Sequence, residues 1–171
     1  MISVTAHSPE TRLKKDNANV ICPPPLIALA FLAGGIGLSF YISTNWLDQI
    51  PFTWRLATGL GLLFSLIILL WADKRFAVKK TPVEPWKPVE ALVTDGIFDR
   101  IRNPMYLGFY TIMLGVALLG AYDMLLPATL VCALVIHWGV IRREEAYLDA
   151  KFGGPYLAYK ARVPRYGWRL W

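Results

Sequence analysis

Ionisable and aromatic side chains that could bind a ligand are concentrated in two segments, the first of which is 94–108, TDGIFDRIRNPMYLG. Asn103 and Pro104 are typical of a helix N-cap and first helical residue, because Asn can accept from free amides and Pro loses no hydrogen bond there. Arg102 lies directly before this start, and Tyr106 follows four residues later. A cation, a helix N-terminus and an aromatic ring would therefore converge, which suits a partly anionic ligand. A well-capped, positively charged membrane anchor would use the same residues.

The second segment, 142–159, has the sequence RREEAYLDAKFGGPYLAY, in which two arginines directly precede two glutamates. Apolar residues at helical spacing predict a helix that ends at Gly153, and Pro155 can begin a second short helix. Adjacent carboxylates add little to membrane topology and repel each other. Glu144 and Glu145 therefore suit the hydroxyl or ammonium groups of a ligand. A cytoplasmic amphipathic tail with salt bridges is the alternative interpretation.

The elements that must position these segments are strongly apolar. Of the 171 residues, 56% are hydrophobic and the mean hydropathy is +0.42, which excludes an ordinary soluble domain. Four blocks, 23–42, 52–71, 105–121 and 124–141, are long enough for transmembrane helices, which need roughly 17–25 residues. We therefore predict an all-α, multi-pass membrane protein with about four transmembrane helices and C-terminal cytoplasmic amphipathic helices, forming a single membrane domain over 1–171.

The basic residues indicate the orientation of these blocks. All of the 18 Lys and Arg residues except Arg55 lie in 1–22, 72–104 or 142–171. The positive-inside rule then places both termini and the 72–104 loop in the cytoplasm. The net charge of +6 is explained by this distribution, so nucleic acid is not expected as a partner. We expect an integral membrane protein of the cell (inner) membrane of a prokaryote.

The short connection at 122–123 makes the third and fourth blocks a tight antiparallel hairpin. The hairpin returns the end of the fourth block to the face on which Arg102 lies, so the two ligand-binding segments are expected to meet. His137, about one turn from that end, is an intramembrane ionisable group and a functional candidate. Cys22 and Cys132 give neither a disulfide framework nor a zinc pattern, and no metal site is expected.

S-adenosylmethionine is one ligand with matching chemistry. It carries a carboxylate, an ammonium, a sulfonium, ribose hydroxyls and an adenine, so its site needs a cation or helix N-terminus, carboxylates and aromatic faces. Arg102, Tyr106, Glu144 and Glu145 supply such groups. Composition alone does not distinguish this ligand from other zwitterions.

The stretches 92–108, LVTDGIFDRIRNPMYLG, and 144–168, EEAYLDAKFGGPYLAYKARVPRYGW, with the hairpin between them, resemble the isoprenylcysteine carboxyl methyltransferase and phospholipid methyltransferase superfamily. Its members are integral-membrane enzymes that methylate lipophilic acceptors with S-adenosylmethionine. The resemblance covers 92–168 and not the first two spans. The family usually has Arg-His-Pro-x-Tyr where this chain has Asn103 in place of the histidine. Asn can cap and hydrogen-bond, but it does not titrate near neutral pH.

The resemblance implies a cytoplasmic-side pocket for S-adenosylmethionine, closed by the segment that carries Glu144 and Glu145. A lipophilic acceptor would enter from the bilayer, among the membrane lipids, and the enzyme would align donor and acceptor and exclude water. Arg142 or Arg143 would hold an acceptor carboxylate or phosphate, and with Glu145 they are the expected catalytic residues. The residues implied in cofactor binding are Thr94, Gly96, Arg102, Asn103, Tyr106, Leu107, Gly108, Glu144, Glu145, Tyr159 and Arg162.

Two other functions are compatible with the residues. The C-terminal part of membrane sterol reductases is similar and uses a nicotinamide cofactor, NADPH, although those chains are much longer and contain more spans. The other alternative is a non-catalytic membrane module that binds lipid or a partner. The identity of the methyl acceptor stays open among a carboxylate, an amine, a thiol and a phospholipid headgroup.

Overall fold

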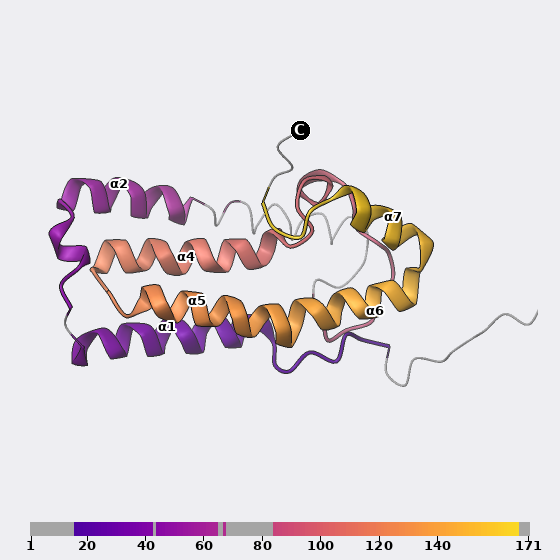
Figure 1. Ribbon diagram of the computed structural model, residues 1–171, viewed down its shortest axis with the longest axis horizontal. Helices are drawn as coiled ribbons and strands as arrows, with labels where there is room; N and C mark the ends of the chain where they lie inside the picture. The colour runs from indigo at the N-terminus through magenta and orange to yellow at the C-terminus, as the bar shows by residue number, and fades with distance from the viewer. Residues whose placement is uncertain (1–15, 43, 65–66, 68–83, 168–171) are drawn as a thin grey trace, which may run out of the picture.

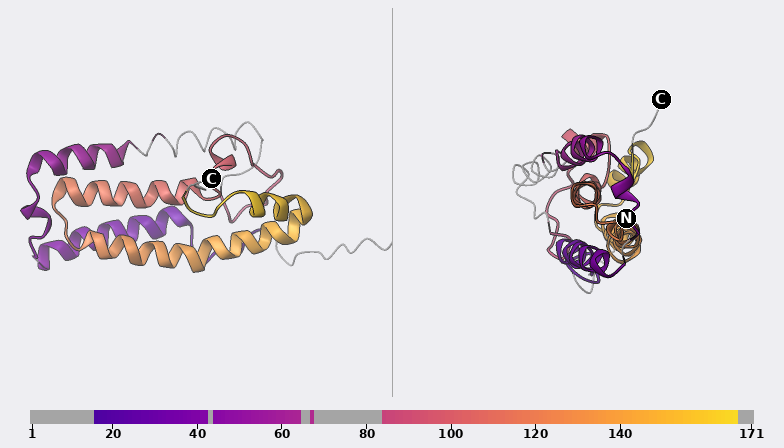
Figure 2. Two further views of the ribbon diagram at one scale, coloured as in Figure 1. Left: turned by 45° about the horizontal axis from the view of Figure 1, so that its top comes forward. Right: turned by 90° about the vertical axis from the view of Figure 1, so that its left-hand side faces the viewer.

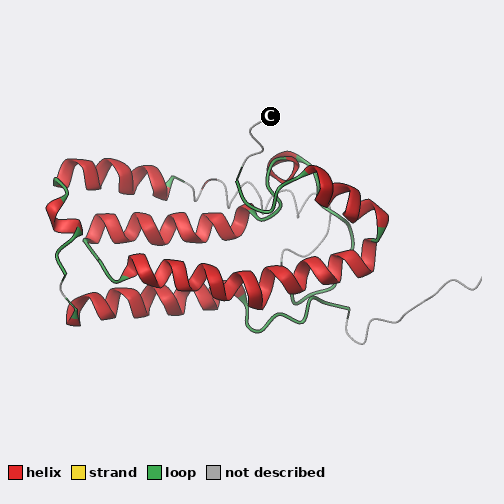
Figure 3. Cartoon of the chain, viewed as in Figure 1, coloured by secondary structure: helices red, strands yellow, loops and turns green. Residues whose placement is uncertain are grey.

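The computed structural model describes residues 16–42, 44–64, 67 and 84–167. Within these ranges every regular element is a helix and no strand occurs, which confirms the all-α prediction for this part of the chain (Figure 3). The α-helices are α1 (Pro24–Tyr41), α2 (Phe52–Leu63), α4 (Pro104–Gly120), α5 (Leu125–Ile136), α6 (Arg142–Phe152) and α7 (Gly154–Arg162). The remaining elements are two 3-10 helices, η1 (Leu47–Gln49) and η2 (Gly96–Asp99), and a π-helical turn, η3 (His137–Ile141).

The long helices form a bundle in which α4 packs on α2 and α5, and α5 also packs on α1 (Figure 1, Figure 2). The side chains between them are apolar, and several are almost completely buried: Met113, Ala117, Leu125, Cys132 and Ile136. Many other large apolar side chains of the bundle are exposed. Apolar residues around the whole helix circumference are typical of helices that face lipid as well as protein.

Among the residues that the structure describes, two helices are long and apolar enough to cross a membrane: Pro24–Tyr41 and the continuous helix Leu125–Phe152. Helix α4 is apolar but shorter, with 17 residues. The predicted span 52–71 is described as α2 only as far as Leu63, and most of its remainder lies outside the described residues. The structure therefore shows an apolar helical protein with two candidate spans, and the count of four stays a prediction.

Elements α5, η3 and α6 form one unbroken helix of 28 residues. At 1.5 Å per residue this helix is about 42 Å long, which exceeds the hydrocarbon core of a bilayer by about 12 Å. The sequence places a boundary at residue 141, but the helix continues through it without a break. Its charged part, which begins at Arg142, extends beyond the length that the core can accommodate.

The π-helical turn lies where this helix changes from apolar to charged. The backbone carbonyl of Gly139 accepts a hydrogen bond from the N–H of Ile21 at 3.2 Å. The Ile21 side chain covers Gly139 so closely that a Cβ atom there would collide with it. The segment that leads into α1 is thereby fixed to the end of the apolar part of the long helix.

Two helices occupy the C-terminal segment, as the sequence predicts. Gly153 ends α6 with φ of 56°, a left-handed value that favours glycine, and Pro155 lies in the first turn of α7. Helix α7 folds back toward the start of α4 (Figure 1). Val163, directly after α7, is buried at 1% exposure, and the chain that follows it passes the N-terminal end of α4.

A tight turn joins α4 to α5, as expected from the short connection at 122–123. Ala121 adopts the left-handed conformation, with φ of 53°, and the N–H of Tyr122 donates to the carbonyl of Ala117. The turn makes α4 and the long helix antiparallel. Consequently α6 lies at the end of the bundle where α4 begins, and Arg102 is brought close to Glu145.

Asp123 connects the two loops at the opposite end of the bundle. Its carboxylate accepts hydrogen bonds from the Thr44 hydroxyl at 2.6 Å and from the backbone N–H groups of Trp46 at 3.0 Å and Leu47 at 2.9 Å. Burial raises the pKa of Asp123, but these hydrogen bonds outweigh it and hold the pKa below its usual value. The α1–α2 connection is therefore held against the α4–α5 turn by a charged group.

Small residues permit close helix contacts at two places. A Cβ atom on Gly59 of α2 would lie 2.7 Å from Leu119 of α4, and one on Gly35 of α1 would lie 2.7 Å from Leu125 of α5. These two glycines therefore permit close packing of α2 on α4 and of α1 on α5. The other glycines of α1 and α2, namely Gly34, Gly37 and Gly61, have open space around them.

Candidate functional site

Glu145 of α6 is buried where α4 begins, with 7% of its surface exposed. Arg102 donates from Nη1 to its Oε1 at 2.8 Å. Arg165 donates from Nε to Oε1 at 2.8 Å and from Nη2 to Oε2 at 2.5 Å. A carboxylate removed from water requires such partners, because desolvation disfavours its charge. The hydrogen bonds to Glu145 raise the pKa of the Arg165 guanidinium, so Arg165 keeps its positive charge.

Backbone contacts hold the C-terminal chain at the start of α4. The N–H of Arg102 donates to the carbonyl of Pro164 at 3.0 Å, and Asn103 Nδ2 donates to the carbonyl of Arg165 at 3.3 Å. Asn103 occupies the N-cap position and Pro104 the first helical position, as the sequence predicts. The Asn103 side chain makes no capping hydrogen bond, however. Its amide is used to hold the arginine that binds Glu145.

Glu144 has a different environment from its neighbour. It is partly buried and accepts a hydrogen bond from the Tyr106 hydroxyl at 3.0 Å. Burial raises the pKa of Glu144 to about 7, the Tyr106 hydrogen bond opposes this increase, and the charge of Glu145 adds to it. The carboxyl group therefore changes charge near neutral pH, as is common for groups at functional sites.

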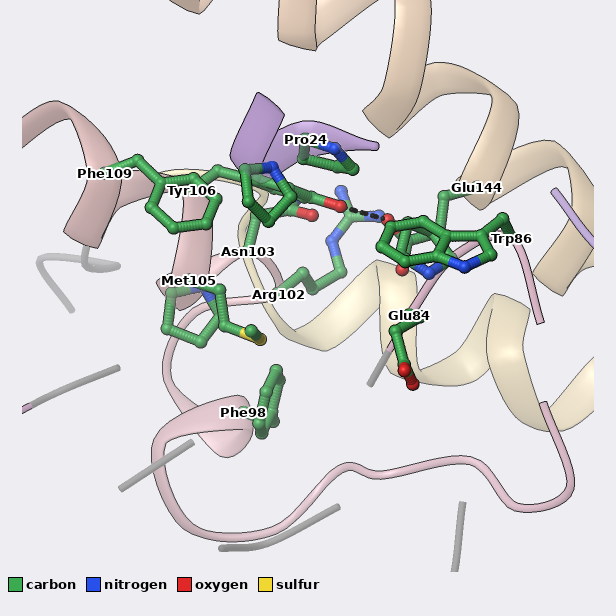
Figure 4. Close-up of a pocket in the computed structure, with 13 residues that line it drawn as sticks. Pro24, Glu84, Trp86, Phe98, Arg102, Asn103, Met105, Tyr106, Phe109 and Glu144 are labelled. Carbon is green, nitrogen blue, oxygen red and sulfur yellow. Dashed lines mark hydrogen bonds between the residues drawn. The ribbon is translucent and has the colours of Figure 1, made fainter. Parts of the chain in front are cut away.

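A cavity of about 540 Å³ lies beside Glu144. Figure 4 shows the Tyr106–Glu144 hydrogen bond close to the Arg102 guanidinium, with the Trp86 ring next to Glu144. The wall is mostly proline and aromatic side chains. Its residues are Pro24, Pro25, Glu84, Pro85, Trp86, Phe98, Arg102, Asn103, Pro104, Met105, Tyr106, Phe109 and Glu144.

A second cavity of about 540 Å³ shares Phe98, Arg102, Asn103 and Glu144 with the first. Its other residues are Val89, Ala91, Leu92, Val93, Glu145, Leu148, Tyr156 and Tyr159. Part of the volume of each cavity is open to solvent, so the two cavities form a partly open site. Because they share the Arg102 and Glu144 side chains, a single ligand with an extended shape could occupy both.

The polar groups of these cavities fit S-adenosylmethionine. Nε of Arg102 is buried and has no hydrogen-bond partner among the described residues. Buried donors in native proteins are nearly always bonded, so this one is available to a ligand oxygen. The carboxylate of Glu144 and the ring faces of Trp86 and Phe98 suit a sulfonium or an ammonium. The tertiary structure thus gathers partners for both charge signs of the cofactor.

Six of the residues expected to bind the cofactor line these two cavities, namely Arg102, Asn103, Tyr106, Glu144, Glu145 and Tyr159. Tyr159 donates its hydroxyl to the carbonyl of Phe98 at 2.7 Å, and burial raises its pKa. This contact supports the loop that contains η2 and therefore one wall of the site. The Tyr159 hydroxyl is already bonded to the carbonyl of Phe98, so the aromatic ring of Tyr159 is the part that would contact a ligand in the second cavity.

The remaining expected residues lie elsewhere. Thr94, Gly96, Leu107, Gly108, Arg142, Arg143 and Arg162 line neither cavity. Arg142 and Arg143 are exposed, and Arg143 donates to the carbonyl of Asn19 at 2.9 Å. Arg162 is exposed and pairs with Asp99 at 3.5 Å. Their assigned contacts with cofactor or acceptor stay predictions.

Sequence reasoning missed the partner of Glu145 and part of the wall. A buried glutamate requires a cation, but seven basic residues follow Ile141. Their sequence positions do not show which of them pairs with Glu145, so Arg165 is not among the predicted site residues. Trp86, which the sequence analysis does not select as a site residue, lines the first cavity. His137 has a partner that the sequence did not identify, because Nδ1 lies 2.7 Å from the Tyr166 hydroxyl.

No group of three or more His, Cys, Asp or Glu side chains that could hold a metal ion occurs in the described part of the chain. Cys22 and Cys132 are both free thiols.

A family model matches more than half of the chain. The family model described as phospholipid methyltransferase matches residues 54–154, a range that contains Arg102, Tyr106, Glu144 and Glu145. The chain belongs to the phospholipid methyltransferase family. This membership confirms the superfamily that the two sequence stretches resemble, and the apolar helices agree with the membrane character of that family.

Two yeast proteins are similar to this member of the phospholipid methyltransferase family. Protein-S-isoprenylcysteine O-methyltransferase of Schizosaccharomyces pombe is 42% identical over 78 residues, which are 43% of this chain and 31% of that protein. The protein of the same name from Saccharomyces cerevisiae is 37% identical over 76 residues, 42% of this chain and 30% of that protein. The matches span about a third of the length of these relatives. No solved structure matches the chain.

Proposed function

We propose that this protein is an integral-membrane methyltransferase that uses S-adenosylmethionine to methylate a lipophilic acceptor. The observation that carries the proposal is the pair of cavities that share Arg102 and Glu144, two residues within the part of the chain that matches the family model. An anchor or scaffold has no need for a buried and a partly buried glutamate beside an arginine with an unpaired Nε and an aromatic-walled cavity.

Bound S-adenosylmethionine supplies a methyl group on a positively charged sulfur. The residues of this chain bind and orient it. Glu144 and the Trp86 and Phe98 rings attract the positive groups, Nε of Arg102 donates to the carboxylate, and the Arg165–Glu145 pair keeps Arg102 in place. Methyl transfer needs alignment of two reactants and exclusion of water more than it needs an acid or base. Asn103, which replaces a titratable residue of the family pattern, is compatible with such a role.

The acceptor reaches the first cavity from the bilayer. Its apolar wall is formed by Pro24 at the start of α1 and by Met105 and Phe109 on α4, which belong to the apolar bundle. A lipophilic chain can lie along these helices while its reactive group reaches Glu144. Isoprenylcysteine carboxylates, phospholipid headgroups and other small lipophiles are all acceptors of this kind. Arg142 and Arg143, exposed on α6, would contact an acceptor carboxylate or phosphate at the membrane surface.

The distribution of basic residues supports a cytoplasmic location for this end of the bundle, with both termini on the same side. Such an orientation gives the site access to a water-soluble cofactor. We further propose the inner membrane of a prokaryote as the location.

Calorimetric titration of the full-length protein in detergent tests the cofactor assignment. We expect saturable binding of S-adenosylmethionine and of S-adenosylhomocysteine, and no binding of NADPH. Arg102→Gln should weaken cofactor binding by about tenfold or more, because one hydrogen bond to a charged group is lost. The matched control Arg100→Gln alters an exposed arginine outside both cavities and should bind normally. A folded protein that binds neither methyl donor nor product would refute the proposal, and transfer of radiolabel from methyl-labelled donor to lipid extract would establish the activity.

A further inference from the structure

A groove on another face of α4 has no role in the proposed reaction. It lies between α4 and the α5–η3 part of the long helix, has a volume of about 690 Å³ and is lined by Leu107, Tyr110, Leu134, His137, Trp138 and Tyr166. None of these residues lines the two cofactor cavities. We refer to it as the α4–η3 groove.

Polar atoms are present in this groove although most of its wall is apolar. The Tyr110 hydroxyl is buried and has no hydrogen-bond partner in the described part of the chain. The Tyr166 hydroxyl lies 2.7 Å from His137 Nδ1. When Tyr166 donates in this pair, neutral His137 carries its proton on Nε2 and becomes a donor. The groove therefore offers at least one unsatisfied donor, and a second one that depends on the His137 tautomer.

The charges near the groove favour an anion. Its six named residues include no carboxylate. Arg142 follows η3 directly and is exposed, whereas Arg165, which precedes Tyr166 in the chain, is paired with Glu145. The Tyr110 hydroxyl can donate to a ligand oxygen, and a buried donor without any partner is costly. An oxygen-rich, negatively charged group is the complementary ligand.

The apolar part of the groove faces the bilayer. Leu134 and Trp138 are 45% and 55% exposed on a helix that is long and apolar enough to cross a membrane. Tryptophan is frequent at the level of lipid headgroups, and His137 and Trp138 lie close to the point at which charged residues begin. A ligand that has its charged oxygens at Tyr110 and His137 would extend an apolar chain into the bilayer beside Leu134.

We propose that the α4–η3 groove binds an anionic amphiphile of the bilayer, with carboxylate or phosphate oxygens that accept from Tyr110 and His137. This site is separate from the proposed methyl-transfer cavities. It is connected to them through the chain, because Tyr166 contacts His137 while the adjacent Arg165 holds Glu145. Occupation of the groove stabilises the position of residues 165–166 and hence the arrangement of the Glu145 cluster.

Quenching of tryptophan fluorescence by brominated lipids tests this proposal with the full-length protein in detergent. The probes are 9,10-dibromostearate, phosphatidylglycerol with the same dibrominated chains, and 9,10-dibromooctadecylamine. We expect saturable quenching by the anionic probes that is lost in Trp138→Phe, and at least fivefold weaker binding of the amine. The tighter of the two anionic probes identifies whether a free carboxylate or a phosphodiester is preferred.

Tyr110→Phe removes one oxygen atom and should weaken binding of the preferred anionic probe by about tenfold, the effect of losing a hydrogen bond to a charged group. The matched control is Tyr41→Phe, which alters an exposed tyrosine at the far end of α1 and should bind normally. Equal affinities for amine and anion, no effect of Tyr110→Phe, or quenching that persists in Trp138→Phe would each overturn the proposal. Cofactor titration of the same samples tests the methyltransferase assignment independently, because the probes are added without methyl donor.

Discussion

The replacement Glu144→Gln is expected to remove a pH dependence from cofactor binding. With a pKa of about 7, Glu144 is ionised to about a tenth at pH 6 and to about nine tenths at pH 8. If the carboxylate binds the sulfonium or ammonium, the apparent affinity is scaled by the ionised fraction. Wild-type affinity should therefore increase about ninefold between pH 6 and pH 8. In Glu144→Gln it should be weaker at pH 8 and nearly constant, because the amide does not titrate.

The assay is calorimetric titration of S-adenosylmethionine at several pH values, in two buffers with different ionisation enthalpies so that proton release is also measured. Glu84→Gln is the matched control, since Glu84 lines the same cavity and its hydrogen bond from Lys87 lowers its pKa. Glu84 is ionised over the whole range, so its variant should keep the wild-type slope. Ionisable groups on the cofactor titrate in the same way with every variant, so a difference in pH slope between variants comes from the protein. The same slope in wild type and Glu144→Gln would refute the reasoning.

The same pKa has a consequence for stability with a defined sign. The folded-state pKa of Glu144 is raised from 4.5 to about 7, so the folded protein binds more protons than the unfolded chain between these values. The contribution of Glu144 to stability is fully present below pH 4.5, decreases as pH rises, and is lost above pH 7, a change of about 3 kcal/mol. Glu144→Gln should raise the melting temperature in detergent at pH 8 and leave it nearly unchanged at pH 5. A variant less stable than wild type at pH 8 would contradict the assigned cause.

Three further predictions concern packing and ion pairs. Gly59→Ala should lower the free energy of unfolding by about 1–3 kcal/mol, since the added Cβ would lie 2.7 Å from Leu119. The control Gly61→Ala, which has open space around it, should be neutral in the same thermal denaturation. Equal effects of the two variants would contradict the packing described. Asp123→Ala should cost about 1–3 kcal/mol by leaving three donors without their acceptor, and an unchanged melting temperature would show that water replaces the carboxylate. Arg165→Gln should weaken cofactor binding at least tenfold. Arg165→Lys should recover part of the affinity, because Lys keeps the charge and loses the two-point contact with Glu145. Equal binding by both variants would exclude a role of the Arg165 charge in holding Glu145.

Local rules were sufficient for the boundaries of several helices. Pro104 and Pro155 lie in the first turns of α4 and α7, and Gly153 ends α6 with positive φ. These positions depend on the backbone of a few adjacent residues, which is why they follow from sequence. The meeting of Arg102 with Glu145 was also predictable, because a turn of a few residues permits only an antiparallel arrangement.

The roles of individual polar side chains were less predictable. Asn103 has the sequence position of a cap, but its amide donates to the carbonyl of Arg165. The partner of Glu145 depends on how the chain after α7 crosses the start of α4, and the sequence contains several equally basic alternatives. The π-helical turn and the Ile21–Gly139 contact likewise depend on packing between segments far apart in the chain. Such contacts are decided by tertiary geometry, which local propensities do not encode.

The sequence by itself determined an apolar helical protein whose basic residues lie almost entirely outside the apolar blocks. It also predicted that two charged segments meet at one end, because hydropathy, charge and turn length are properties of the chain alone. Only the tertiary structure decided that Glu145 pairs with two arginines, whereas Glu144 faces a cavity and has a pKa of about 7. Two adjacent glutamates are chemically identical in the unfolded chain. The direction in which each side chain projects from α6, and the amount of water it loses there, make them different.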